Sequence, residues 1–175
     1  MARLAEVTPL PAASVIVLRD APLEVLLLRR SAKSSFVPDA WVFPGGIAEE
    51  EDLRETAVRE TFEEAGLQLD ASQLVPTSRW ITPVGIPKRF DTLFFLAVVP
   101  RDAQVTVDGN EIVDSMWIAP ADALARRDLK LVFPTIKNLE AIANFTRADE
   151  LLAARRGAII EPVQPVLVDG RPRIL

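Results

Sequence analysis

Glu63 and Glu64 follow Glu60 by three and four residues in the sequence, so three carboxylates recur at i, i+3 and i+4. If this segment is helical, the spacing puts all three on one face. Like charges so placed repel by roughly 0.2–0.5 kcal/mol per pair in an exposed helix, and the carboxyl end of a helix also disfavours anions. A hard divalent cation supplies the missing counter-charge, because Mg²⁺ takes oxygen ligands and is often held by carboxylates plus substrate phosphates. The trio therefore predicts a Mg²⁺ or Mn²⁺ site.

A helix over about residues 52–65 is predicted to carry these carboxylates. Its apolar residues recur at helical spacing and predict one apolar stripe, made of Leu53, Ala57, Val58, Phe62 and Ala65. Gly66 is a natural residue for the left-handed turn that ends a helix. Three other acids lie at the start of this predicted helix: Glu49, Glu50 and Asp52. Favourable interaction with the positive end of the helix dipole is sufficient to explain their presence there.

The same stretch resembles the Nudix box: a glycine, five residues, a glutamate, seven residues, then Arg-Glu-x-x-Glu-Glu-x-Gly and an aliphatic residue. The matching positions are Gly45, Glu51, Arg59, Glu60, Glu63, Glu64, Gly66 and Leu67. Thr61 stands at one aliphatic position of the pattern. The resemblance implies an α/β (α+β) fold, an α/β/α sandwich with a mixed β-sheet. It also implies a hydrolase that uses Mg²⁺ or Mn²⁺ to split the diphosphate bond of a nucleoside diphosphate linked to another group.

The resemblance also implies roles for individual residues. The metal ligands are expected to be Glu60, Glu63 and Glu64 with a backbone carbonyl of Gly45 or Gly46. Catalytic roles are expected for Glu64, Glu63, Arg59, Glu51 and Glu111.

Within this catalytic set several assignments stay open. Glu51 is either an outer metal ligand or a base, and Glu111 is either a distant acid or a turn residue. Arg59 is expected to pair with Glu55 or Glu63, four residues away on either side. The general base is one of the trio's carboxylates or Glu111.

The glycine loop leaves its register open. Family members usually carry a glycine pair whose second member begins the box, but counting back from Arg59 makes Gly45 the box position. The loop is therefore one residue short. Either Glu51 or Asp52 can take the usual acidic place, and either glycine carbonyl can face the metal.

Residues upstream of the box are similar to the signature of Nudix enzymes that cleave coenzyme A. Arg30, Ser31 and the run Phe43 to Gly46 keep its spacing, whereas Ser35 replaces an arginine and Asp39 a glycine. Coenzyme A or an acyl derivative is one expected substrate. The alternative substrates are ADP-ribose or NADH, and a nucleoside triphosphate. The alternative functions are a catalytically idle Nudix domain that senses a ligand, and a purely structural domain.

Four cations are expected beside the substrate, because guanidinium and ammonium groups bind phosphates. They are Arg30, Arg79, Lys88 and Arg89, with Gly46 beside them. The tryptophans, Trp41, Trp80 and Trp117, lie in apolar strand patterns and are expected in the core.

Composition excludes several classes of protein. The 175 residues predict a single domain over 1–175, with the box at 45–67 and C-terminal helices and a tail at 134–175. With neither cysteine nor histidine, thiolate and imidazole chemistry are excluded. A net charge of −5 argues against nucleic-acid binding but not against a small nucleotide substrate. The apolar run at 93–99 is too short to span a membrane, so a cytoplasmic protein is expected.

The remaining pattern predicts alternating strands and helices packed on a mixed sheet. Strands are expected at 14–18, 24–28, 41–44, 79–84, 89–98 and 112–118. Further helices are expected at about 120–127, 134–145 and 147–156. Asp169-Gly170 predicts a hairpin turn in the tail, 161–175. This tail is expected either to form an edge hairpin or to pack on a partner subunit in a homodimer.

Overall fold

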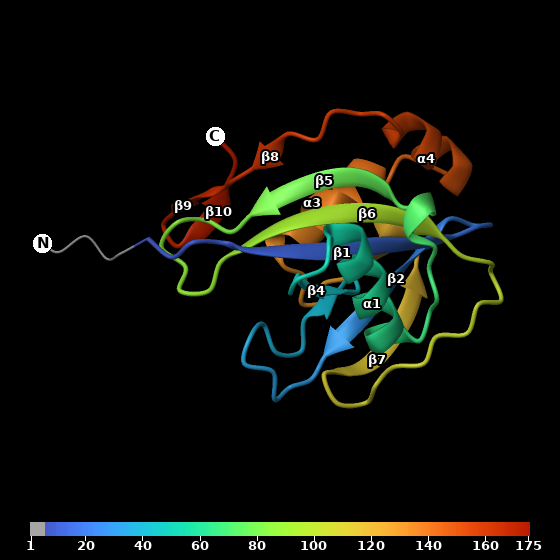
Figure 1. The fold of residues 1–175 in the computed structure, drawn as a ribbon, viewed down its shortest axis with the longest axis horizontal. Coiled ribbons are helices and arrows are strands. Elements are labelled where there is room, and N and C mark those ends of the chain that lie inside the picture. The colour runs from blue at the N-terminus through green and yellow to red at the C-terminus, as the bar shows by residue number, and fades with distance from the viewer. Residues whose placement is uncertain (1–5) are drawn as a thin grey trace, which may run out of the picture.

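The computed structural model describes residues 6–175 and shows strands and helices in mixed order (Figure 1). The strands are β1 Leu10–Arg19, β2 Glu24–Arg30, β3 Trp41–Val42, β4 Gly45–Ile47, β5 Val75–Ile81, β6 Phe90–Val98, β7 Ile112–Ile118, β8 Pro162–Val163, β9 Val166–Val168 and β10 Arg171–Arg173. The helices are α1 Leu53–Ala65, α2 Pro120–Ala125, α3 Phe133–Ile142 and α4 Ala148–Arg155, with a short 3₁₀ helix at Ala71–Gln73.

Eight strands form one mixed sheet, as the sequence predicts. Its main order is β3-β2-β1-β6-β5-β8, while β4 pairs with β1 and β7 with β2. β1 and β6 are parallel over nine residue pairs, from Leu10 opposite Phe90 to Leu18 opposite Val98. β5 and β8 are also parallel, and the other pairs in this sheet are antiparallel.

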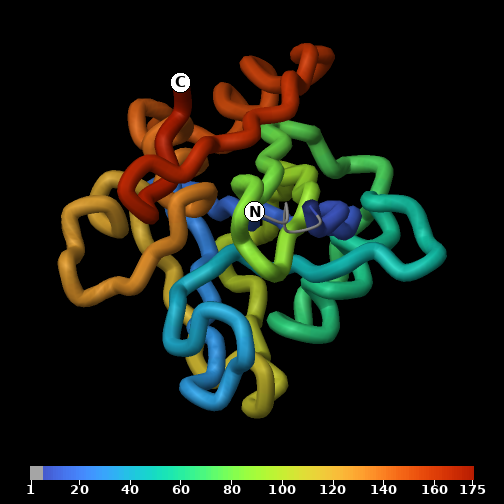
Figure 2. Tube along the Cα trace, turned by 90° about the vertical axis from the view of Figure 1, so that its left-hand side faces the viewer, coloured from blue at the N-terminus to red at the C-terminus, as the bar shows by residue number. Residues whose placement is uncertain are grey.

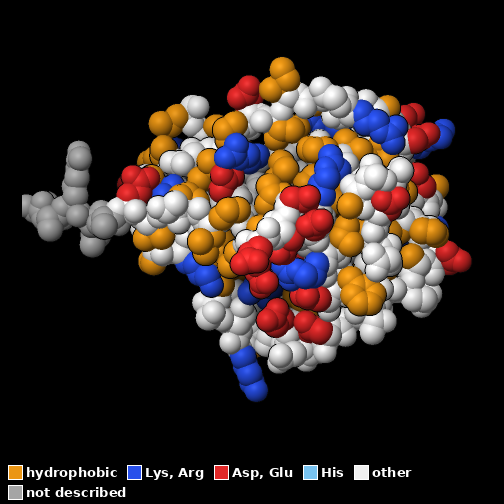
Figure 3. Space-filling model, in the orientation of Figure 1, with side chains coloured by type: hydrophobic (Ala, Val, Ile, Leu, Met, Phe, Trp, Pro, Cys, Tyr) orange, Lys and Arg blue, Asp and Glu red, His pale blue; other side chains and the backbone are white. Residues whose placement is uncertain are grey.

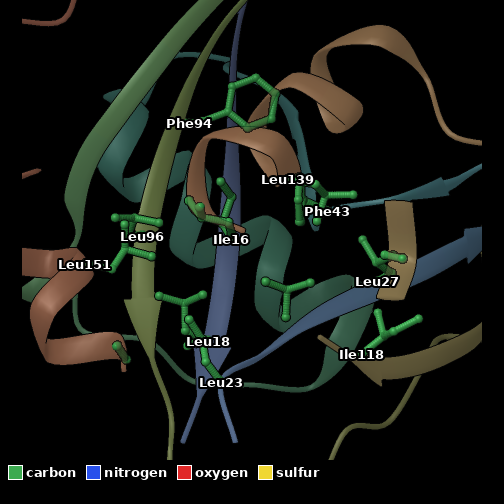
Figure 4. Close-up of a cluster of buried hydrophobic side chains, with 14 of the residues drawn as sticks. Ile16, Leu18, Leu23, Leu27, Phe43, Phe94, Leu96, Ile118, Leu139 and Leu151 are labelled. Carbon is green, nitrogen blue, oxygen red and sulfur yellow. The ribbon is translucent and has the colours of Figure 1, made fainter. Parts of the chain in front are cut away.

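Helices cover both faces of this sheet because its central strands are apolar on both sides. In β1, Val15 and Val17 belong to the core beneath α1, whereas Ile16 and Leu18 belong to the opposite core. Residues from α2, α3 and α4 pack into that second core, part of which is drawn in Figure 4. The expected α/β/α sandwich is confirmed. Within residues 6–175, α1 is the only α-helix that contributes buried residues to the first core.

The boundaries of α1 agree with the prediction, but the buried face differs. Asp52 caps the first turn, and Gly66 ends the helix with a φ of 69°. Phe62 is not part of a buried stripe, since it is 55% exposed, whereas Thr61 and Glu64 are buried. Each residue turns an α-helix by about 100°, so residues two positions apart point in nearly opposite directions. A helix that turns Glu64 inward must turn Phe62 outward.

Two strand predictions need correction. The strand predicted at 79–84 instead covers Val75–Ile81, since the residues after Ile81 form the turn that leads into β6. The glycines predicted to form a loop after 41–44 belong to a strand of their own, β4, which pairs with β1.

The tail forms the predicted hairpin. β9 and β10 pair antiparallel in a separate two-stranded sheet, joined at Asp169 and Gly170. Both turn residues have positive φ, 52° and 73°, as a tight hairpin turn requires. Ahead of this hairpin, β8 extends the main sheet beside β5. Within residues 6–175, no helix combines the length and apolar character needed to cross a membrane.

Candidate functional site

Two glycines in β4 allow this strand to lie tightly between β1 and α1. A Cβ built on Gly45 would lie 2.5 Å from the Ala13 carbonyl oxygen, in the neighbouring backbone. A Cβ built on Gly46 would lie 2.4 Å from the Glu60 carboxyl carbon. A side chain at position 46 would therefore occupy the space where the Glu60 carboxyl now lies. The glycine pair is needed here for close approach, not for an unusual φ.

Arg59 links the acids of α1 to the segment before it. Its guanidinium donates to Glu51 Oε1 from Nη2 at 2.6 Å and from Nε at 3.0 Å. Its Nη1 forms ion pairs with Glu60 at 2.9 Å and with Glu63 at 3.3 Å. The guanidinium thus holds three carboxylates in one arrangement.

The Arg59 contacts bear on the open register and correct one expected pairing. Glu51, not Asp52, is the acid that meets Arg59. The hydrogen bonds from Arg59 are the largest cause that lowers the pKa of Glu51 to about 2, so this carboxylate stays charged. Asp52 and Glu55 form a reciprocal cap at the start of α1. Glu55 is therefore not the partner of Arg59, because its side chain turns back toward the helix start.

Glu64 is the buried member of the acidic trio. It is 6% exposed, and burial raises its pKa to about 9, helped by the charge of Glu60 and a hydrogen bond between the two carboxyls. Arg30 lowers this pKa and Glu111 raises it, so both lie near enough to act on Glu64. Glu63 is the outward member of the trio, with a side chain 54% exposed. Figure 3 shows acidic side chains gathered over α1, with lysine and arginine side chains among them.

The four expected cations fall into two pairs. Arg30 donates to the Phe36 carbonyl and to the Ser34 hydroxyl, at 2.9 and 2.8 Å. Lys88 lies over the Phe36 and Phe90 rings. Neither cation forms an ion pair with a carboxylate within residues 6–175.

The other two expected cations are already neutralised. Arg79 makes a two-pronged ion pair with Asp91, at 2.5 and 2.8 Å, and lines a groove with Leu53 and Ile160. Arg89 is only 2% exposed. Its guanidinium donates to backbone carbonyls of Val7 and Thr82, and pairs with Glu6. The structure therefore places Arg89 in the interior, where its guanidinium binds the N-terminal segment and the turn before β6 and does not face solvent.

The family profile of the NUDIX domain matches residues 8–139. The chain belongs to the Nudix family. A solved Nudix hydrolase from Alicyclobacillus acidocaldarius has a TM-score of 0.77 to this fold and 26% sequence identity, and the match covers 87% of this chain and 99% of that one.

Two curated Nudix relatives are similar over part of their length. Human m7GpppN-mRNA hydrolase NUDT17 is 33% identical over 125 residues, which cover 63% of this chain and 38% of the relative. Acyl-coenzyme A diphosphatase NUDT19 of Xenopus laevis is 24% identical, over 73% of this chain and 62% of the relative. The chain thus spans less than two thirds of either of these Nudix relatives.

Nudix hydrolases generally use divalent metals, and the donor atoms of this site fit such a group. Within residues 6–175, no three acidic side chains are gathered into a ready-made metal site. The carboxyls of Glu60 and Glu64 nevertheless lie against each other, with Glu60 beside Gly46 and Glu64 buried. Glu63 forms an ion pair with Arg59. Carboxylate and carbonyl oxygens are the ligands that Mg²⁺ and Mn²⁺ prefer. Two close carboxyls that repel one another are stabilised when a cation lies between them.

Sequence reasoning did not foresee that Phe36 and Phe90 meet beside Arg30. Phe36 and Phe90 pack edge to face, with ring centroids 5.3 Å apart. One signal could have indicated the unusual loop that carries Phe36. Asp39 stands where the coenzyme A signature has a glycine, and its φ is 60°. Aspartate is among the few other residues that tolerate this conformation, so the substitution keeps the backbone shape that glycine would allow.

Proposed function

We propose that this protein is a Nudix pyrophosphohydrolase, which hydrolyses the diphosphate bond of a nucleoside diphosphate derivative with the help of Mg²⁺ or Mn²⁺. The observation that carries the proposal is the packing of Glu60 against Gly46 with the buried Glu64 carboxyl beside it. Burying an acid costs free energy unless it is paired, so this arrangement lowers the stability of the fold. A function that needs two inward-facing carboxylates explains why the arrangement is kept.

The metal would be held by Glu60, Glu63 and Glu64 with a backbone carbonyl of Gly45 or Gly46. When bound, it supplies Lewis-acid polarisation of the phosphates and lowers the pKa of a bound water. Arg59 keeps Glu60 and Glu63 oriented through its ion pairs. Glu51 in turn holds the Arg59 guanidinium in place through two hydrogen bonds.

The substrate's phosphates would meet Arg30, which acts on Glu64 and is not neutralised by a carboxylate in the described part of the chain. A carboxylate then accepts the proton of the attacking water. The carboxylates available for this step are Glu60, Glu63, Glu64 and the exposed Glu111.

Coenzyme A or an acyl derivative is our first candidate substrate. Arg30 and the run Phe43 to Gly46 keep the spacing of the coenzyme A signature, and Asp39 keeps a glycine-like backbone at one of its changed positions. The similarity to an acyl-coenzyme A diphosphatase supports the same choice. The similarity to an m7GpppN-mRNA hydrolase favours a capped dinucleotide as the second candidate.

The test is a panel of diphosphates at matched concentration, with product masses measured in Mg²⁺ and in Mn²⁺. The panel contains coenzyme A, acetyl-coenzyme A, ADP-ribose, NADH and a capped dinucleotide. We expect metal-dependent hydrolysis of coenzyme A between the two phosphates of its diphosphate. If another member is hydrolysed and coenzyme A is not, coenzyme A is excluded as the substrate, whereas diphosphate hydrolysis remains supported. No turnover of any member, with ligand binding retained, would point instead to an idle ligand-sensing domain.

A further inference from the structure

The segments around the α1 carboxylates bring a pair of aromatic rings to one end of the sheet. Phe36 lies between β2 and β3, and Phe90 begins β6. Phe90 pairs with Leu10, at the start of β1, where β4 also pairs. β2 runs antiparallel to β1, so its last residue, Arg30, lies at the same end. Figure 2 looks onto this end, with the blue 31–40 loop, the teal segment after β4 and the green turn before β6 around it.

Two cations lie against these rings. The Lys88 ammonium is 5.9 Å from the Phe36 centroid and 5.8 Å from that of Phe90. The Arg30 guanidinium carbon is 5.9 Å from the Phe36 centroid. Both charges therefore lie within twice 5.9 Å, about 12 Å, of each other. Attraction to a ring face holds a cation in place without neutralising it.

The charge of Lys88 stands out against those of Arg79 and Arg89. Those two arginines each have a carboxylate partner, whereas Lys88 is exposed, lies over the two rings and forms no ion pair within residues 6–175. Although the net charge of the protein is −5, two cations without carboxylate partners on one ring pair make the local potential more positive, and such a potential attracts an anion.

The loop that carries Phe36 is held in a fixed shape. Arg30 donates to the Phe36 carbonyl, and the Lys130 ammonium donates to the Pro38 carbonyl at 2.9 Å. Val37 has a φ of 40°, a left-handed conformation that costs free energy for a β-branched side chain. Such strain persists only where surrounding contacts impose it. The ring is thus placed before any ligand arrives.

We propose that Lys88, positioned by the Phe36–Phe90 ring pair, binds a phosphate of the substrate beyond the two that flank the cleaved bond. This inference rests on the proposed function and names its substrate class, a nucleoside diphosphate derivative with at least one additional phosphate. Arg30 serves the cleaved diphosphate beside Glu64, and Lys88 serves the additional group farther along the ring wall. That group is either a monoester on the ribose or a further phosphate in the chain.

Two matched substrate pairs distinguish these sources. Coenzyme A and dephospho-coenzyme A differ by a ribose phosphate, and diadenosine tetraphosphate and diadenosine diphosphate differ in chain length. We expect Lys88→Met to raise KM at least about tenfold for the phosphate-rich member of one pair, the scale of a lost charged hydrogen bond. KM for the poorer member of that pair should stay within about twofold.

A lysine in the neighbouring loop provides the control. Lys33 is exposed and close in sequence to Phe36 but lies over neither ring. Lys33→Met should leave the preference for additional phosphate unchanged. The proposal is overturned if Lys33→Met has the same effect as Lys88→Met. It is also overturned if Lys88→Met changes all four substrates equally, or none.

The positioning role of the rings needs its own readout. Phe90 is the ring to change, because Lys88 lies over it, whereas the Arg30 guanidinium lies over Phe36. Phe90→Leu should raise KM for the phosphate-rich substrate about threefold, as the loss of a cation–π contact of roughly 0.5–1 kcal/mol implies. It should leave kcat unchanged and add nothing in a Lys88→Met background. Phe90→Tyr should keep the wild-type KM, because it keeps the ring. A Phe90→Leu effect that is unchanged without Lys88, or equal for ADP-ribose, would show a base-stacking or structural role instead.

Binding separates this inference from the proposed function. If wild type hydrolyses neither these four substrates nor any other member of the diphosphate panel, the proposed function fails. The preference is then measured by calorimetry on wild type and Lys88→Met, which differ only at the proposed phosphate site. A tenfold loss of preference on removing Lys88 still supports the phosphate site, and an unchanged preference overturns it.

Discussion

The Glu60 carboxyl lies where a side chain at position 46 would be, since a Cβ on Gly46 would come within 2.4 Å of the Glu60 carboxyl carbon. The preceding glycine is constrained differently, because a Cβ on Gly45 would meet the backbone of Ala13 and Ser14. A side-chain end can move aside, whereas strand backbone cannot. The two glycines should therefore respond differently to the same added methyl group.

Gly46→Ala should lower kcat/KM at least about tenfold while changing stability little, because it displaces only the Glu60 carboxyl. Gly45→Ala should lower the free energy of unfolding by about 1–3 kcal/mol, the usual cost of overpacking. Urea unfolding and steady-state kinetics on both variants measure the contrast. Gly46→Ala with normal activity would show that the position of Glu60 is unimportant for catalysis.

Glu64→Gln should lower kcat at least about a hundredfold, the lower scale for loss of general-base or electrostatic assistance. Glu50→Gln is the control, since Glu50 is exposed and lies before the helix. It should leave kcat nearly unchanged. The reverse ranking would contradict the assignment of the site to the inward face of α1.

Millimolar Mg²⁺ or Mn²⁺ should raise the melting temperature, since a ligand that binds only the native state stabilises it by mass action. The double variant Glu63→Gln/Glu64→Gln should lose this rise. Its metal-free form should be at least as stable as wild type, because glutamine at position 64 removes the free-energy cost of keeping a buried carboxyl protonated. Thermal unfolding with and without a chelator is the measurement. An equal metal-induced shift in both proteins would rule out the trio as ligands.

The stability of the metal-free protein should fall as pH rises from about 4.5 to 9. Burial raises the pKa of Glu64 from 4.5 to about 9, so the folded state keeps a proton that the unfolded state has lost. The free energy of unfolding is highest, as far as Glu64 is concerned, below pH 4.5. It falls by up to about 1.4 kcal/mol per pH unit as the pH rises toward the folded-state pKa. Unfolding in chelator should give a flatter profile for Glu64→Gln, and parallel profiles would contradict this origin.

Arg89→Met should destabilise the fold without changing KM, because Arg89 is buried and holds two backbone carbonyls. Losing those contacts leaves buried acceptors unpaired, at about 1–3 kcal/mol each. Arg30→Met should do the opposite, raising KM with a smaller loss of stability. Denaturant unfolding and KM measurements on both variants test the contrast. A large increase in KM for Arg89→Met would show that Arg89 binds the substrate.

Local sequence determined the helix that carries the trio. Its cap, its terminal glycine and the spacing of its acids depend on nearest neighbours, and the structure reproduces them. Alternating apolar residues likewise determined most strands and the two-faced sheet. The matches at Ile112–Ile118 and at the Asp169–Gly170 hairpin come from the same short-range patterns.

Tertiary structure alone decided which side of α1 faces inward and which cations stay un-neutralised. Helical spacing cannot say whether Phe62 or Glu64 is buried, because that depends on β4 lying against Glu60. Likewise, arginine looks the same in sequence whether it is buried on backbone carbonyls, as Arg89 is, or lies beside a carboxylate site, as Arg30 does. The contact between Phe36 and Phe90 joins residues 54 positions apart. Such contacts are set by how strands pair across the sheet, and no local pattern encodes that pairing.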